Sequence, residues 1–119
     1  VLGTALNYLF EQNGQWYVAP DPAMHPEIIT RELAKTSAWF MNHPTVMFSK
    51  RRIVNCGMYD DNMKGMSEDF ELWIRLIRNG MNLRNLPQSF HYLRINEKSA
   101  SRNFNPENSQ MIQNLQAKL

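Results

Sequence analysis

Two adjacent carboxylates, Glu68 and Asp69, stand at the start of a run whose apolar residues recur at helical spacing. Four apolar residues fall at i, i+3, i+4 and i+7, a pattern that predicts one buried helix face. They are Phe70, Trp73, Ile74 and Ile77. Acids in the first turn face unpaired backbone N–H groups and the positive end of the helix dipole, which favours their ionised form. The pair is therefore a candidate for acid–base chemistry at this end of the helix.

The same pair also has a purely structural interpretation, because acids at a helix start compensate the dipole without any further role. On the opposite side of the predicted helix, Glu71, Arg75 and Arg78 are expected to form a solvated face. Gly80 follows the last periodic residue and is expected to end the helix as its C′ residue.

Short strands and helices alternate along the rest of the chain and must position these acids. Residues 3–10 and 16–19 are predicted strands, joined through Asn13-Gly14 as a hairpin. The composition further predicts a helix over residues 26–35, a strand over 45–49 and a helix over 51–55 that stops at Gly57. Pro87 separates two more predicted strands, residues 82–86 and 89–94. A final helix is expected from Pro106 to Leu119. Its apolar stripe is Met111, Ile112, Leu115 and Leu119.

Composition narrows the class of protein. The chain has 119 residues, a length typical of one domain, and its net charge of +2 is spread along the sequence, which argues against a nucleic-acid partner. Lys50-Arg51-Arg52 is interpreted as a solvated helix start. The single Cys56 excludes an internal disulfide and suits a reducing compartment. No apolar stretch reaches membrane-spanning length and no secretory signal opens the chain, so a cytoplasmic location is expected. The first residue is Val1 and not Met, a hint that another segment precedes it.

Several further segments surround the acidic pair in a fixed order. Upstream lie residues 42–52, beginning Asn-His-Pro-Thr-Val-Met-Phe, and then Gly57-Met58-Tyr59-Asp60. Downstream come a segment ending in Tyr92-Leu93-Arg94 and the Ser-Ala-Ser of residues 99–101. This ordered set resembles the carboxyl-terminal half of glycosyltransferase family 2, the inverting nucleotide-sugar enzymes of the GT-A fold. The resemblance covers most of the chain.

The resemblance implies a fold, an activity and roles for residues. The fold would be α/β, a small mixed sheet flanked by helices, with residues 1–119 as the single, acceptor-binding portion of a GT-A (Rossmann-like) catalytic domain. The activity would be hexosyltransferase-like transfer from a nucleotide-diphosphate sugar to an acceptor hydroxyl with inversion, as in polysaccharide biosynthesis. Asp69 matches the family's base, and Glu68, His43, Thr45 and Arg94 are the expected substrate-binding residues. The acceptor would be a saccharide or a lipid-linked saccharide, which is compatible with peripheral membrane association.

The family's nucleotide-binding strand and its Asp-x-Asp metal motif belong upstream of the part that this chain resembles. No Asp-x-Asp occurs here, and Asp60-Asp61 is not a substitute. A divalent cation, Mg²⁺ or Mn²⁺, is therefore expected in the complete enzyme with its ligands mostly outside this chain, and the chain alone is expected to be inactive. Many relatives have His where this chain has Asn96, so metal contacts from His91 or Asn96 stay open.

Other polar and aromatic residues have two interpretations each. His43 precedes a proline, so it either shapes an extended loop or presents its imidazole to the sugar. Trp39 and Phe40 either stack on an acceptor sugar or pack in the core, and packing is favoured. Arg94 and Arg102 either approach the donor diphosphate, with residues 99–105 as a closing loop, or form exposed salt bridges.

Two other functional classes compete with the transferase. One is a non-catalytic protein-interaction or carbohydrate-binding module of similar fold. The other is a hydrolase that uses Glu68 and Asp69 as acid and base. Adjacent residues on a helix point about 100° apart, which fits poorly with two carboxyls on either side of one glycosidic bond. The hydrolase is therefore the weaker alternative.

Overall fold

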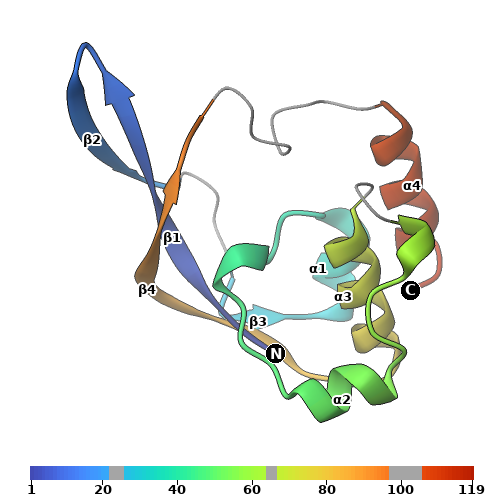
Figure 1. Ribbon diagram of the computed structural model, residues 1–119. Coiled ribbons are helices and arrows are strands. Elements are labelled where there is room, and N and C mark those ends of the chain that lie inside the picture. The colour runs from blue at the N-terminus through green and yellow to red at the C-terminus, as the bar shows by residue number, and fades with distance from the viewer. Residues whose placement is uncertain (22–25, 64–66, 97–105) are drawn as a thin grey trace.

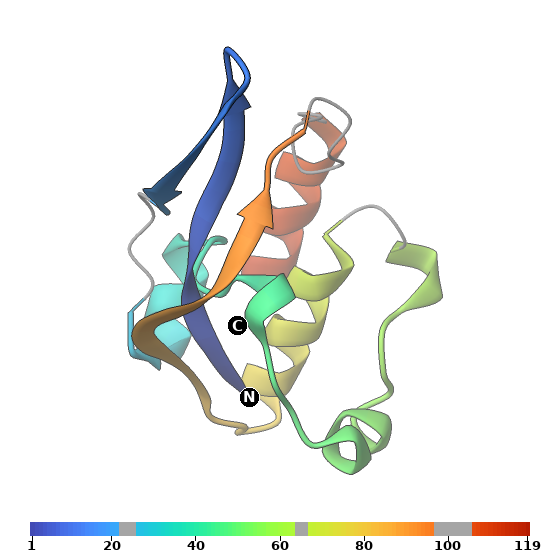
Figure 2. The same ribbon diagram turned by 60° about the vertical axis from the view of Figure 1, so that its left-hand side comes forward.

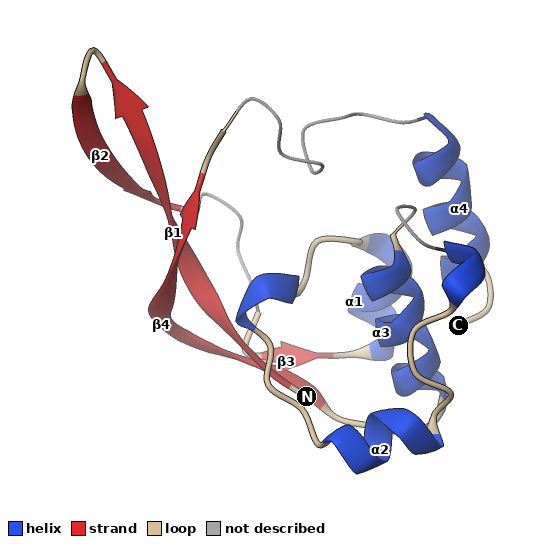
Figure 3. Ribbon diagram, in the orientation of Figure 1, coloured by secondary structure: helices blue, strands red, loops and turns tan. Residues whose placement is uncertain are grey.

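Two long strands, β1 (Leu2–Gln12) and β4 (Leu83–Arg94), run parallel at the centre of a four-stranded sheet. The computed structural model describes residues 1–21, 26–63, 67–96 and 106–119. Strand β2 (Gln15–Pro20) pairs antiparallel with β1, and β3 (Ile28–Ile29) pairs antiparallel with β4. The order β2-β1-β4-β3 makes a mixed sheet (Figure 3), and the predicted α/β class is confirmed.

Helices α1, α3 and α4 pack together beside the sheet, while the β1–β2 hairpin projects away from them (Figure 1; Figure 2). The helical elements are α1 (Arg31–Thr36), η1 (His43–Thr45), α2 (Lys50–Asn55), η2 (Asp61–Met63), α3 (Glu68–Arg78) and α4 (Pro106–Gln116), with η marking short 3₁₀ turns. No helix in the described ranges has the length and apolar character needed to cross a membrane.

The hairpin turn follows directly from its two residues. Asn13 and Gly14 both adopt positive φ, 52° and 75°, as a type I′ turn requires. The turn's twist matches that of the flanking strands, and the ring of Phe10 on β1 stacks on Tyr17 of β2 at a centroid distance of 5.7 Å. The predicted hairpin is confirmed.

Helix α3 is the central element of the core. Its buried residues include those predicted, except that Ile77 is only partly buried, and they also include two fully buried leucines, Leu72 and Leu76. The helix ends as expected at Gly80, which has a φ of 73° and donates its N–H to Ile77, while Met81 donates to the carbonyl of Leu76. These two bonds form a Schellman motif. The stripe predicted for α4 also packs on the core.

The helix predicted over residues 26–35 is wrong in its first half. Ile28 and Ile29 instead form β3, opposite Arg84 and Leu83 of β4. The helix begins later because Thr30 is the N-cap and its hydroxyl accepts a hydrogen bond from the N–H of Leu33. Two adjacent β-branched residues beside an open strand edge favour pairing over helix.

The strand predicted over residues 45–49 is also wrong. Residues 43–45 form the 3₁₀ turn η1, and Met47 makes a single bridge to Leu2 of β1. The β-branched and aromatic composition of this segment was misleading because only one residue of it reaches a free strand edge.

The two strands predicted on either side of Pro87 are one continuous strand, β4, with an irregular register. Thr4 of β1 lies opposite Leu86, but the next residue, Ala5, lies opposite Ser89. Two extra residues of β4 are accommodated at Pro87, as in a bulge, so the missing proline N–H costs no regular ladder bond. The proline therefore distorts the strand without ending it.

Asn85 is the one polar residue of the described chain that is fully buried, and its amide ties three segments together. Its Nδ2 donates to the carbonyls of Pro26 at 2.9 Å and Phe40 at 2.7 Å. The backbone of Gly3 lies against this amide, since a Cβ there would meet Asn85 Oδ1 at 2.5 Å. Asn85 thereby links strand β4 to the segments before β3 and before η1.

We expect Asn85→Ala to lower the free energy of unfolding by about 2 to 3 kcal/mol, because two buried carbonyls lose their donor. Urea denaturation followed by circular dichroism measures the change. Asn82→Ala is the matched control, since Asn82 is exposed and its backbone carbonyl, which accepts from the Val1 amino group, is kept in the variant. Equal midpoints for the two variants would contradict a structural role for the buried amide.

Candidate functional site

Asp69 lies in the first turn of α3, two residues after the N-cap residue that turns the chain into the helix. That residue, Ser67, has a left-handed backbone with φ 58° and ψ 39°. The N–H of Phe70 donates to Asp69 Oδ1 at 2.8 Å, and the side chain is 33% exposed. The carboxylate is therefore oriented by the helix start and still reachable from solvent.

His43, the predicted substrate-binding residue of the Asn-His-Pro segment, lies next to this carboxylate. Its Nδ1 is 3.9 Å from Asp69 Oδ2, and its ring meets the edge of Trp73 at a centroid distance of 6.0 Å. The turn η1 therefore presents the imidazole towards α3, against a wall formed by the core tryptophan. Two of the predicted site residues, 26 positions apart in sequence, are brought together.

Tyr59 completes this cluster from a third segment. Its hydroxyl lies 3.0 Å from His43 Nε2, and the two rings are 5.8 Å apart at an angle of 55°. Burial raises the pKa of the Tyr59 phenol, and the negative charges of Asp69 and then Glu68 raise it further. The phenol therefore stays protonated well beyond neutral pH. We refer to His43, Tyr59 and Asp69 as the site cluster.

From the sequence, Tyr59 is only one member of the Gly-x-Tyr-Asp segment, and no functional role is predicted for it. The available signal was its place beside Asp60 in that segment. Asp60 itself has a structural task, because its Oδ1 accepts hydrogen bonds from the backbone and side chain of Asn62 at the start of η2.

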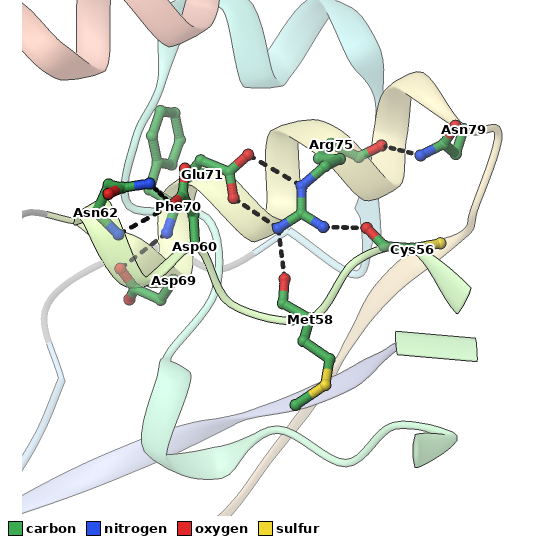
Figure 4. Close-up of polar contacts among 9 residues, drawn as sticks. All are labelled: Cys56, Met58, Asp60, Asn62, Asp69, Phe70, Glu71, Arg75 and Asn79. Carbon is green, nitrogen blue, oxygen red and sulfur yellow. Dashed lines mark hydrogen bonds and ion pairs between the residues drawn. The ribbon is translucent and has the colours of Figure 1, made fainter. Parts of the chain in front are cut away.

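Arg75 fixes the loop that carries Tyr59 (Figure 4). Its guanidinium binds Glu71 through two hydrogen bonds of 3.0 and 2.7 Å and also donates to the carbonyls of Cys56 and Met58. The hydrogen bond that Arg75 donates to Glu71 is the main reason why the pKa of Arg75 is raised. The predicted solvated face is therefore wrong for these two residues, whose side chains are only 23% and 15% exposed.

We expect Arg75→Met to lower the free energy of unfolding by about 2 to 4 kcal/mol, because Glu71 loses its partner and two loop carbonyls lose their donor. Arg75→Lys should recover only part of this loss, since an ammonium group cannot reproduce the planar fork. Urea denaturation provides the measurement. Arg78→Met, at an exposed arginine in the last turn of the same helix, should change little. A similar loss in both variants would contradict the role of the loop contacts.

Thr45 and Arg94 lie in different surroundings. The Thr45 hydroxyl accepts from the N–H of Thr4 at 3.0 Å and donates to the carbonyl of Asn42 at 2.8 Å, so it joins η1 to strand β1. The Arg94 guanidinium stacks over the ring of Trp16 at 4.7 Å, at the hairpin end of the sheet. Both contacts are structural, and the substrate-binding roles of Glu68, Thr45 and Arg94 stay predictions.

Of the two aromatic residues before η1, packing is confirmed for Phe40, which is 1% exposed, and is wrong for Trp39, which is 72% exposed. His91 is a partly exposed residue of β4. No group of three His, Cys, Asp or Glu side chains in the described parts of the chain could hold a metal ion. Arg102 and the predicted closing loop at 99–105 lie outside the described residues.

One curated protein shows sequence similarity to this chain. It is an uncharacterized glycosyltransferase of Haemophilus influenzae, 39% identical over 61 residues. The similar segment covers 51% of this chain and 21% of the relative, so the chain spans only a minor part of that protein's length. No family model and no solved structure matches the chain.

Proposed function

We propose that this chain is the acceptor-binding part of an inverting, hexosyltransferase-like glycosyltransferase of family 2 with a GT-A fold. The donor would be a nucleotide-diphosphate sugar, and the acceptor a saccharide or lipid-linked saccharide. Three kinds of observation support the proposal: the ordered motif series, the similarity to a protein named as a glycosyltransferase, and the mixed α/β fold. The main observation behind the proposal is the contact between His43 and Asp69, because these residues come from separate segments of the motif series.

The proposed chemistry is a single displacement in which Asp69 is the general base. As the acceptor oxygen forms its bond to the anomeric carbon, its proton passes to the Asp69 carboxylate. The bond from that carbon to the diphosphate breaks at the same time, and the diphosphate leaves with the electron pair. Attack from the face opposite the leaving group inverts the anomeric centre. The 33% exposure of Asp69 leaves its oxygen accessible to an incoming hydroxyl.

A divalent cation would need ligands other than the described side chains. The described residues do not form a set that could hold Mg²⁺ or Mn²⁺. We therefore propose that any divalent cation of the complete enzyme is bound by residues outside these, where it would stabilise charge on the departing diphosphate. No step at the site cluster depends on it.

Nucleoside diphosphate release by the complete polypeptide, measured on a panel of nucleotide sugars with and without saccharide acceptors, tests the proposal. The expected result is release that depends on an acceptor, with a product of inverted anomeric configuration by NMR. Release with retained configuration would contradict the single displacement.

A non-catalytic carbohydrate-binding module is the second candidate. It is favoured by three strongly exposed aromatic side chains that could stack on sugar rings, Trp39, Phe90 and Tyr92, with 72%, 71% and 60% exposure. In the same assay this function predicts saccharide binding without any turnover of donor.

A further inference from the structure

The imidazole of His43 lies between two oxygen atoms, the hydroxyl of Tyr59 and a carboxylate oxygen of Asp69. Its Nε2 is 3.0 Å from the Tyr59 hydroxyl, and its Nδ1 is 3.9 Å from Asp69 Oδ2. A neutral imidazole carries one N–H and one lone pair, so the two neighbours decide which nitrogen carries the proton.

The carboxylate favours a proton on Nδ1, because a carboxylate oxygen can only accept. A lone pair on Nδ1 would face a negative oxygen, whereas an N–H on Nδ1 is attracted to it. Nε2 is then the acceptor, and the Tyr59 hydroxyl is its donor. Tyr59 can fill that role because burial and the nearby carboxylates raise its pKa and keep its proton in place.

We infer that Tyr59 is a positioning residue: by donating to Nε2 it fixes His43 as the Nδ1–H tautomer, whose N–H points at Asp69 and orients that carboxylate. The part of this inference that concerns catalysis rests on the function proposed above. At 3.9 Å the Nδ1 to Oδ2 contact is longer than a hydrogen bond, so the attraction orients the carboxylate while Oδ2 stays free for the acceptor's proton.

The loop geometry supports a positioning role, since the backbone just before Tyr59 is held by contacts with α3. The residue before it, Met58, has a φ of 57°, an uncommon conformation for a side chain of its size, and its carbonyl accepts from Arg75. Arg75, paired with Glu71, therefore holds the peptide unit that joins Met58 to Tyr59. Tyr59 is oriented before any substrate arrives.

NMR of the ¹⁵N-histidine-labelled chain tests the tautomer directly, through the couplings between the ring nitrogens and the ring protons. The spectra are recorded at a pH well above the ordinary range of imidazole titration. The chain has three histidines, and His43→Asn identifies the signal. We expect His43 as Nδ1–H, and a shift towards Nε2–H in Tyr59→Phe but not in the control Tyr92→Phe, at an exposed tyrosine of β4. His43 found as Nε2–H, or left unchanged by Tyr59→Phe, would overturn the inference.

Kinetics of the complete polypeptide provide a second readout, using a nucleotide sugar that it turns over. Tyr59→Phe should lower kcat by up to about a hundredfold with little change in donor KM, because the base is misoriented but the donor site is untouched. An unchanged kcat would overturn the positioning role. If no nucleotide sugar is turned over, the proposed function fails, and the tautomer measurement still decides the structural inference.

Discussion

Asp69→Asn is expected to lower kcat for sugar transfer by roughly 10²- to 10⁴-fold in the complete polypeptide, the range that a positioned general base contributes. The amide has nearly the same shape as the carboxylate, and its Oδ1 can still accept the hydrogen bond from the N–H of Phe70. The start of α3 should therefore remain intact. The amide cannot take the acceptor's proton, so only the chemical step is affected, and donor KM should change little.

Steady-state kinetics with donor and acceptor varied separately measure this effect. Asp61→Asn is the matched control, because Asp61 is an exposed aspartate at the start of η2, close in sequence to the site cluster. Its turnover should equal that of the wild type. Full turnover by Asp69→Asn would remove Asp69 from the mechanism, and a fall in both variants would indicate a general loss of acidic charge.

The elements that the sequence predicts well are those with local causes. The hairpin depends on Asn13-Gly14, and α3 depends on its apolar period and on the glycine at its end. The predictions for Ile28–Ile29 and for residues 45–49 are wrong because strand formation depends on a partner edge that is remote in sequence. Propensity alone does not contain that information.

The site cluster was predictable in part for the same reason. The motif series indicated Asp69 and His43 without their contact, since 25 residues separate them in the chain. The role of Tyr59 depends on the positive φ of Met58 and on the carbonyl contacts of Arg75. Arg75 lies on the helix side that amphipathic spacing assigns to solvent, and a loop distant in sequence covers it.

Trp73→Ala is expected to lower the free energy of unfolding by about 3 to 5 kcal/mol, the usual cost of truncating a buried aromatic side chain to alanine. Trp73 is 2% exposed, lies at the centre of α3 and forms the wall against which the His43 ring rests. A loss of this size is a large part of the roughly 5 to 15 kcal/mol that stabilises a typical domain. The variant should be largely unfolded at moderate urea.

Two further variants separate packing from the other properties of this tryptophan. Trp73→Phe should cost less, about 1 kcal/mol, because a smaller aromatic ring still fills most of the site and the indole Nε1, which has no hydrogen-bond partner among the described residues, is removed. Trp39→Ala truncates the same side chain at a 72% exposed position and should leave the urea midpoint almost unchanged. Circular dichroism during urea denaturation compares all three. A Trp73→Ala loss no greater than that of Trp39→Ala would contradict the core position of Trp73, and with it the rigid wall behind His43.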